Sequence, residues 1–372
     1  MTAKVQTIIN LVEQLAPKYL AEEWDNIGLQ IGSPAGEVHK VLVTLDINTE
    51  VVEEAIQADV DLVVAHHPLI FSPLKSLRFD TPLGRNIALL IGNSIAVYAA
   101  HTNLDSAQDG VNSVLAQRLG LQETGVLAPS YREKYCKIVV FVPQGQVEQV
   151  RDAMTQAGAG WIGNYSHCTF QTAGTGTFKA GAGAQPFIGQ IGELERAEEY
   201  RLETIIAERG VGKVVKAMLK AHPYEEVAYD LYPLLNEGVS LGLGRIGKLP
   251  APVTLGELAQ QVKELLGLTN LRLGGDLGKK IEKVALCGGS GAALIHKAVF
   301  QGADVLLTGD IKYHEGQDIL AQGMCFIDAG HNGTEQIIVP VLAQYLREKA
   351  AEAKLDIEVV ESRINTDPFQ FA

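Results

Sequence analysis

The same order of apolar and helical segments occurs twice in this chain, once near each end. Each copy begins with an apolar run, continues through a segment with helical spacing and returns to a second apolar run. The spacing from Lys40 to Asp61 in the first copy equals that from Lys283 to Asp304 in the second. Strands that alternate with helices are typical of βαβ units, which build a largely parallel sheet covered by helices. We therefore expect an α/β fold made of two similar halves.

A third apolar run follows in each half and leads into a histidine with an acid four positions further on. The pairs are His101 with Asp105 in the first half and His331 with Glu335 in the second. If His331 lies in the first turn of a helix, Glu335 faces the same way one turn later, so both can act on one ion. Polar pairs at this spacing are also common on solvated helix faces, but their placement after strands favours a site. The match between the halves is loose, so common ancestry and separate origin both stay open.

Two further histidines, His66 and His67, follow the apolar run 61–65 and precede Pro68. Ligands bind beyond the carboxyl ends of parallel strands, and all four histidines fall at that edge, so we expect one site built from both halves. Neighbouring side chains of a strand point to opposite faces, so both imidazoles reach one site only where the strand ends. Pro68 favours such an end, because proline cannot donate to the sheet ladder. A histidine pair that merely caps a strand is the alternative.

These four imidazoles and two carboxylates include no thiolate, and such a donor set suits Zn, Fe, Mn or Ni. So many ligands around one cation would leave little room for water or substrate. We therefore predict two divalent metal ions in one core. The four cysteines are dispersed without a CxxC pair, and we interpret them as reduced thiols.

Two other features have open interpretations. His314 stands in the segment of the second half that corresponds to His66 and His67, and it either lines the mouth of the site or lies in a surface loop. The glycine-rich stretch 287–291 lies between a strand and a helix, where free backbone N–H groups can hold an anionic group such as phosphate. A plain tight turn is the commoner explanation for such a stretch.

Residues 125–240 differ in pattern from the two halves that they separate. The predicted elements are a strand, a helix, a hairpin, a strand, a helix and a strand, at 137–142, 147–156, 165–179, 201–207, 211–221 and 226–234. This order is close to a ferredoxin-like βαββαβ module, an α+β domain that buries one sheet face under two helices. We expect a domain insertion. The predicted domains are the two halves of the core, 1–124 and 241–372, and the inserted domain 125–240.

Charge and hydropathy exclude some classes of partner. The net charge is −13 and no run is rich in lysine and arginine, so nucleic acid and an anionic membrane surface are poor partners. No stretch approaches the roughly 20 apolar residues that span a bilayer. The start of the chain has helical spacing instead of the uninterrupted apolar core of a signal peptide. We expect a cytoplasmic protein.

Five stretches carry a more specific signal: EWDNIGL at 23–29, AHHPL at 65–69, AHTNLD at 100–105, TGDIKYH at 308–314 and DAGHNGTE at 328–335. With these stretches the chain resembles the GTP cyclohydrolase I type 2 family, also described as Ngg-interacting-factor-three-like proteins with a dinuclear metal centre. The resemblance implies that two divalent metals are bound, with a carboxylate bridging and His101 nearby. The implied metal ligands are His66, His67, Asp105, His331 and Glu335. It also implies a toroidal homohexamer, and the insert resembles the PII-like and CutA-like fold of longer members.

The family name implies a hydrolase that opens the guanine ring of GTP, with a metal-bound hydroxide attacking C8 and formate leaving. Two cations roughly 3.5–4 Å apart can hold and acidify the water that this reaction needs. His101 is the candidate catalytic residue, because imidazole can move a proton near neutral pH. The same centre would equally serve a metal-dependent phosphohydrolase that acts on a nucleotide or cofactor. A non-catalytic assembly that senses a metal or a metabolite, with the insert as its regulatory part, is the third hypothesis.

Overall fold

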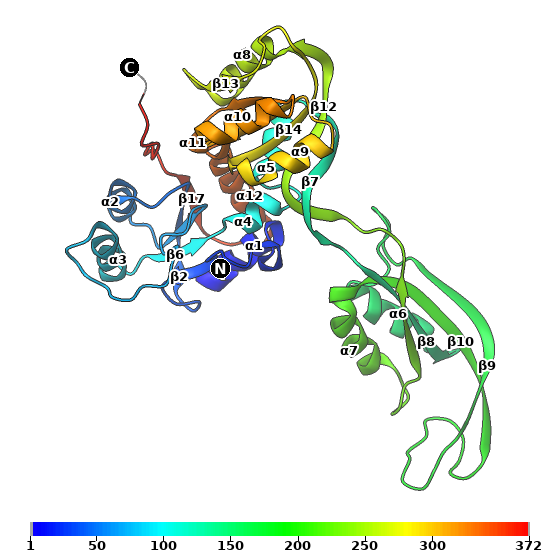
Figure 1. Cartoon of the computed structure of the whole chain (residues 1–372). Coiled ribbons are helices and arrows are strands. Elements are labelled where there is room, and N and C mark those ends of the chain that lie inside the picture. The colour runs from blue at the N-terminus through cyan, green and yellow to red at the C-terminus, as the bar shows by residue number, and fades with distance from the viewer. Residues whose placement is uncertain (1–2, 371–372) are drawn as a thin grey trace. The chain divides into compact units, whose positions relative to one another are not determined.

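The computed structural model describes residues 3–370, and the chain divides into two compact units (Figure 1). Unit 1 consists of the residues up to Tyr131 together with those from Leu241 onward, and unit 2 consists of Arg132–Ser240. Unit 1 is therefore assembled from both ends of the chain. No helix within residues 3–370 combines the length and the apolar character that crossing a bilayer requires.

The first sheet of unit 1 has five strands, of which four run parallel and only β2 is antiparallel to its neighbour. The order is β17 (Glu358–Glu361), β4 (Lys40–Thr44), β5 (Leu62–Ala65), β6 (Ala96–Ala99) and β2 (Gly28–Ile31). One face packs against α2 (Thr49–Gln57) and α3 (Pro82–Gly92), and the other against α1 (Val5–Leu15) and α12 (Ile338–Glu352). Because the central strands are buried on both faces, their sequences are almost entirely apolar.

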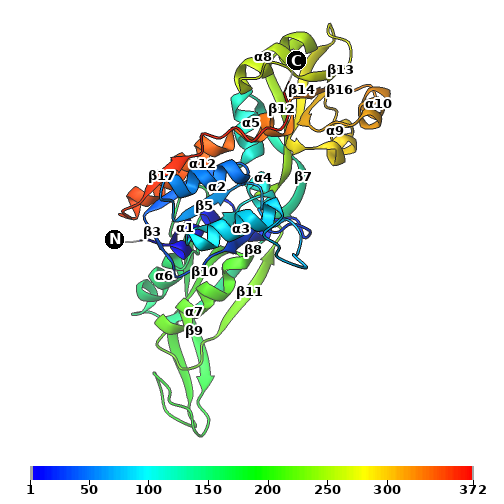
Figure 2. The same ribbon diagram turned by 90° about the vertical axis from the view of Figure 1, so that its left-hand side faces the viewer.

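The second sheet of unit 1 has six strands around a parallel centre. The order is β13 (Arg272–Gly274), β16 (Cys325–Asp328), β15 (Val305–Gly309), β14 (Lys280–Ser290), β12 (Ser240–Thr254) and β7 (Gln122–Arg132). β14, β15 and β16 are parallel to one another, whereas β12 and β13 run antiparallel to β14 and β16. Figure 2 shows α8 (Leu255–Leu266) on one side of this sheet and both α9 (Ile295–Phe300) and α10 (Tyr313–Ala321) on the other, in agreement with the core contacts. The predicted α/β class is confirmed.

Shorter elements connect the strands of unit 1. They are β1 (Ala3–Lys4), β3 (Glu37–Val38), the 3-10 turns η1 (Lys18–Leu20) and η3 (Ala292–Leu294), and the helices α4 (Thr102–Ser106), α5 (Val111–Arg118) and α11 (His331–Glu335). The two shortest helices, α4 and α11, each begin just after the third parallel strand of their half. They carry the two His-x-x-x-acid pairs to the carboxyl ends of the strands.

In each sheet of unit 1, the carboxylate of one aspartate accepts hydrogen bonds from the backbone near the start of a neighbouring parallel strand. Asp61 Oδ2 accepts the backbone N–H groups of His39 and Lys40 at 2.7 and 2.9 Å. Asp304 stands at the same position in the other half, and its Oδ2 accepts two successive N–H groups of β14 at 2.9 and 2.8 Å. The equal spacing in the sequence thus corresponds to the same hydrogen-bonded arrangement in both halves.

Unit 2 is a four-stranded antiparallel sheet with two helices packed on one face. The chain runs through β8 (Tyr135–Pro143), α6 (Val147–Gln156), β9 (Thr169–Lys179), β10 (Leu194–Ala207), the 3-10 turn η2 (Glu208–Gly210), α7 (Val211–Ala221) and β11 (Tyr229–Leu234). The order across the sheet is β11-β8-β10-β9. Val140, Val142 and Leu202 pack under both helices in one apolar core.

The predicted hairpin within residues 165–179 is wrong. Residues Thr169–Lys179 form one strand, β9, which pairs along its whole length with β10. The glycines that suggested a turn lie inside the strand, and a Cβ at Gly176 would overlap the side chain of Glu199 on β10. Gly176 therefore makes room for a neighbouring side chain, and the turn lies after Lys179.

Candidate metal centre

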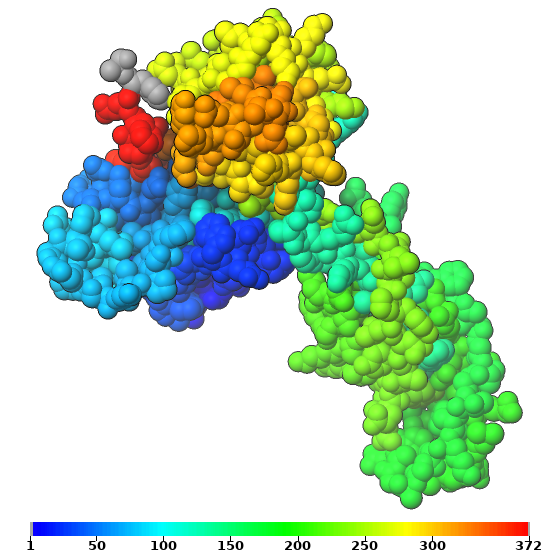
Figure 3. Space-filling model, viewed as in Figure 1, coloured from blue at the N-terminus to red at the C-terminus, as the bar shows by residue number. Residues whose placement is uncertain are grey.

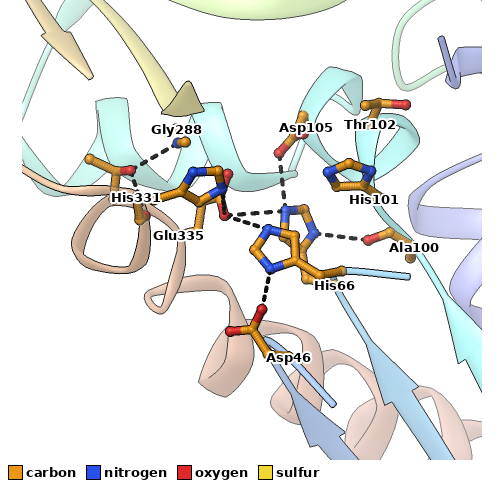
Figure 4. A network of polar contacts seen from close by, with 12 residues as sticks. Asp46, His66, Ala100, His101, Thr102, Asp105, Gly288, His331 and Glu335 are labelled. Carbon is orange, nitrogen blue, oxygen red and sulfur yellow. Dashed lines mark hydrogen bonds and ion pairs between the residues drawn. The ribbon is translucent and has the colours of Figure 1, made fainter. Parts of the chain in front are cut away.

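The histidines predicted to form a site all lie at the carboxyl ends of parallel strands in unit 1. His66 and His67 follow β5 directly, His101 follows β6 and precedes α4, and His331 opens α11 just after β16. Figure 4 shows the labelled side chains of His66, His101, His331 and Glu335 turned toward a common centre. The structure thus brings together residues from both ends of the chain.

The two adjacent histidines share the site because β5 ends at Ala65. The N–H groups of His66 and His67 donate to the carbonyls of Thr44, the last residue of β4, and Leu45 at 3.1 and 2.8 Å. The two rings nevertheless lie on the same side, with centroids 4.9 Å apart. Side-chain atoms of His66, His67 and His101 that can bind a cation all lie within 4.8 Å of one another.

Each of the four imidazoles is oriented by an oxygen that accepts from or faces its Nδ1 atom. These contacts are His66 with the Ala100 carbonyl at 2.9 Å, His67 with Asp46 at 2.7 Å, His101 with Asp25 at 2.9 Å and His331 with Asp310 at 2.7 Å. A hydrogen bond at Nδ1 places the ring proton there and leaves the lone pair of Nε2 free in the neutral ring. All four rings are therefore prepared to offer Nε2 to a cation.

Sequence reasoning missed the roles of three of these partners, Asp25, Asp46 and Asp310. A signal was present, because Asp46 and Asp310 come one or two residues after the parallel strands β4 and β15, at the same sheet edge as the histidines. Asp310 also has φ of 60°, a left-handed conformation that aspartate tolerates better than most residues. This conformation accompanies the contact between its carboxylate and His331.

Two buried carboxylates lie between the imidazoles. Glu335 Oε2 is 3.0 Å from His67 Nε2, 3.1 Å from His331 Nε2 and 3.8 Å from His66 Nε2. Asp105 Oδ1 is 3.6 Å from His66 Nε2. Glu335 thus contacts imidazoles from both halves of unit 1.

Several buried polar atoms at this centre have no hydrogen-bond partner. Among residues 3–370, the unpaired buried atoms include His66 Nε2, Asp105 Oδ1 and Glu335 Oε2, which face one another. Buried polar atoms are nearly always satisfied, so three that converge on one point fit a bound cation. Candidate cation-binding triads are formed by His66 with Asp105 and Glu335, and by His67 with His331 and Glu335. The donor chemistry fits a divalent metal.

The pKa shifts of His67, His331 and Glu335 are those expected for a site that attracts positive charge. Burial opposes the charged form of His67, but the neighbouring Asp46 and Glu335 carboxylates outweigh burial and raise its pKa to about 10. The contact with Glu335 raises the pKa of His331 to about 9. Burial would raise the pKa of Glu335, yet the three imidazoles around it hold that pKa well below its usual range. Protons on His67 and His331 therefore balance Glu335 when no cation does.

Burial at the centre also raises the pKa values of Asp105 and Cys287. Burial, followed by the neighbouring Glu335 carboxylate, raises the pKa of Asp105 to about 7, although His66 opposes the shift. Burial and the two carboxylates also raise the pKa of the Cys287 thiol. The thiol therefore stays protonated, which agrees with a centre that uses imidazole and carboxylate ligands.

His101 borders the histidine pair of the centre. Burial would raise the pKa of Asp25, but hydrogen bonds from His101 and Thr102 lower it to about 2, so this carboxylate stays charged beside the ring. The His101 ring lies 5.3 and 5.4 Å from the His66 and His67 rings, centroid to centroid. The exposed Trp24 ring meets His101 edge-on at 6.1 Å.

The glycine-rich stretch 287–291 is the irregular end of β14, where the pairing with β15 shifts register between Leu286 and Ser290, and not a separate turn. The N–H groups of Gly288, Gly289 and Gly291 donate to the side chains of Asn112, Thr334 and Thr308, each at 2.9 Å. These donors are therefore not free to hold a phosphate. Gly289 has a further role, because its φ is 61° and a Cβ there would overlap Glu335 Oε1.

A cavity of about 720 Å³ opens beside His67 and His331. Its wall also includes Asp310, Arg272 and the C-terminal segment 366–370, which is red in Figure 3. His314 is exposed on α10, where it contacts Gln317, and it is not among the described residues that line the cavity. The surface interpretation of His314 is therefore the better one.

Residues 3–368 match the model of the Duf34/NIF3 (NGG1p interacting factor 3) family. The chain belongs to the Duf34/NIF3 family. The resemblance inferred from the sequence is confirmed.

Relatives in this family match the chain over nearly its full length. A protein of Halalkalibacterium halodurans named GTP cyclohydrolase 1 type 2 homolog is 48% identical, with 99% of each chain covered. A Bacillus subtilis protein of the same name is 46% identical over 98% of each chain. The solved structure of a Bacillus cereus protein related to NIF3 has a TM-score of 0.93 at 49% identity, covering 100% of this chain and 99% of that one. The Bacillus cereus protein shares the fold over the full length of this chain.

Proposed function

We propose that this Duf34/NIF3 protein is a hydrolase that depends on two divalent metal ions and acts on a small molecule, with GTP as the first candidate substrate. The observation that carries the proposal is the convergence of three unpaired buried atoms, His66 Nε2, Asp105 Oδ1 and Glu335 Oε2. Leaving such groups unsatisfied costs about 1–3 kcal/mol each, and more for charged groups. A bound cation would remove that cost.

The proposed ligands fall into two triads. His66, Asp105 and Glu335 would hold one ion, and His67, His331 and Glu335 would hold the other. Glu335 is common to both triads, so it would help to hold both ions. Zn, Fe, Mn and Ni are all compatible with these donors.

Side chains next to the proposed ligands orient the imidazoles for metal binding. Asp46 and Asp310 fix the tautomer and orientation of His67 and His331 through their Nδ1 atoms. A pair of divalent ions at such a site supplies an activated water and polarises the bond that it attacks. We assign His101 the transfer of a proton, because it borders the cluster and is held by the charged Asp25 at Nδ1, which leaves Nε2 for exchange.

The cavity beside the centre supports a small-molecule substrate. Its volume, about 720 Å³, falls in the range of pockets that enclose ligands of drug or nucleotide size. The relatives named GTP cyclohydrolase 1 type 2 homolog motivate GTP as the first compound to test. Opening of the guanine ring at C8 would release formate, whereas a phosphohydrolase would release phosphate.

The test is an assay of the full-length protein, stripped of metal and reloaded with Mn, Fe or Zn, in which formate and phosphate are measured after addition of GTP. Formate release that disappears in Glu335→Gln supports ring opening. Phosphate release without formate identifies a phosphohydrolase instead. Metal binding without turnover of GTP or of any compound in a cell-extract screen overturns the hydrolase proposal and favours a sensing assembly.

We also propose that unit 2 is a ferredoxin-like insertion related to the PII-like and CutA-like fold. Its strand–helix–strand–strand–helix–strand sequence and its sheet order β11-β8-β10-β9 support this assignment. The equivalent aspartates Asp61 and Asp304 similarly support the proposal that unit 1 consists of two related halves.

A further inference from the structure

Unit 2 contains a cavity of about 470 Å³ that is separate from the centre in unit 1. Its wall includes Phe141 of β8, Gly176 of β9 and Glu199 of β10. Phe141 alternates along its strand with Val140 and Val142, which pack under the helices. The cavity therefore lies on the sheet face away from α6 and α7.

A buried carboxylate forms part of the cavity wall. Glu199 is only 7% exposed, and its Oε1 accepts a hydrogen bond from the Tyr224 hydroxyl at 2.8 Å. Within the described part of the chain, no hydrogen bond or ion pair is made to the other oxygen, Oε2. That oxygen occupies the space beside Gly176 that a Cβ would fill. Buried carboxylates favour a positive partner, and one oxygen of Glu199 remains available for it.

Three aromatic rings surround the same space. The ring centroids of Phe178 and Phe187 lie 6.0 and 6.2 Å from that of Tyr224. Tyr224 is held in place through its N–H, which donates to His222 Nδ1 at 3.1 Å, while His222 Nε2 faces the Phe141 carbonyl at 2.9 Å. Burial and the Glu199 carboxylate raise the pKa of Tyr224, so its hydroxyl stays protonated and donates.

The rim of the cavity adds further negative charge. Glu225 and Glu226 also line it, and Lys179 is the single cationic side chain among the lining residues. The Glu225 carboxylate accepts the Gln185 N–H at 2.8 Å, which ties the loop after β9 to the segment after α7. Aromatic faces together with a carboxylate form the chemistry that binds organic cations.

We propose that this cavity binds an organic ammonium ion, with the cationic group against Glu199 and its alkyl substituents against Phe178, Phe187 and Tyr224. A neutral molecule of the same shape would leave Glu199 Oε2 without a positively charged partner. The proposal is independent of any reaction in unit 1.

The test compares choline with its uncharged isostere 3,3-dimethylbutan-1-ol by calorimetric titration of the full-length protein. We expect choline to bind at least about tenfold more tightly than the alcohol, since a desolvated cation over aromatic rings gains this much. Glu199→Gln keeps an acceptor for Tyr224 and should weaken choline binding by about tenfold. Glu198→Gln is the matched control, because Glu198 is the next residue of β10, is exposed and does not line the cavity.

Phe187→Ala is a second variant that should fold normally, because Phe187 is more than half exposed and lies in the loop after β9. This variant should weaken choline binding while its far-ultraviolet circular dichroism stays unchanged. Equal binding of choline and the alcohol would overturn the proposal. So would unchanged choline binding in both Glu199→Gln and Phe187→Ala, or the absence of choline binding to the wild-type protein.

Discussion

Glu335 Oε2 lies 3.0 Å from His67 Nε2, although the two residues come from opposite ends of the chain. The same oxygen is 3.1 Å from His331 Nε2, its neighbour on α11. One buried carboxylate therefore contacts imidazoles from both ends of the chain. This position makes Glu335 the residue whose removal should affect both proposed metal ions.

Replacing the two acids should have different effects on metal content. Glu335→Gln should reduce bound metal to less than about a tenth of wild type, because both triads include this residue. Asp105→Ala should remove only the ion of its own triad and leave about half of the metal. Elemental analysis with circular dichroism measures both effects. Glu348→Gln, on the exposed face of α12, is the control, and full metal content in Glu335→Gln would contradict the assignment.

Metal binding should release protons at pH 8. In the metal-free protein the pKa values of His67 and His331 are about 10 and about 9, so both rings are protonated at this pH. A cation binds only the neutral ring, so we expect release of about two protons, and affinity that rises with pH until these groups are deprotonated. Calorimetry in two buffers of different ionisation enthalpy counts the protons. An affinity that does not change between pH 6 and 9 would disprove this linkage.

Gly289 should be required for the centre. Its φ of 61° and the overlap of an added Cβ with Glu335 Oε1 predict that Gly289→Ala displaces the shared carboxylate and lowers metal content severalfold. Gly302→Ala is the matched control, because Gly302 has φ of 71° and open space around it. Both variants should lose about 1 kcal/mol of unfolding free energy from backbone strain. Only Gly289→Ala should lose metal, and equal metal content in the two variants would exclude the steric role.

The aspartates behind the imidazoles should tune metal affinity. Asp46→Asn and Asp310→Asn keep the shape of the side chain but remove the charge beside His67 and His331. We expect affinity to fall by about 10- to 100-fold, as for other residues that orient metal-binding histidines. Competition with a chelator measures the change. Asp80→Asn, at an exposed residue that pairs with Arg78, should leave affinity unchanged.

The homohexamer implied by the family resemblance stays a prediction. Six chains of 40.0 kDa give a particle of about 240 kDa. Light scattering during size-exclusion chromatography measures this mass directly. A mass of one chain at micromolar concentration would contradict the predicted assembly.

Local patterns in the sequence were sufficient for several elements of secondary structure. Residues 147–156 and 211–221 were predicted as helices, and α6 and α7 have these same bounds. The strand runs at both ends of the chain were also located, because hydrophobic periodicity depends only on near neighbours. The prediction of a hairpin within 165–179 was wrong because Gly176 makes room for the side chain of Glu199 on the neighbouring strand. Such a contact between distant residues does not show in a local pattern.

By itself, the sequence determined the α/β class, the family and the edge of the sheets at which polar side chains gather. The tertiary structure alone decided which atoms meet there: Asp25, Asp46 and Asp310 behind the imidazoles, and one carboxylate between His67 and His331. The reason is physical. Periodicity and propensity act over a few residues, whereas hydrogen bonds, burial and unpaired charges depend on distances that exist only after both ends of the chain have packed together.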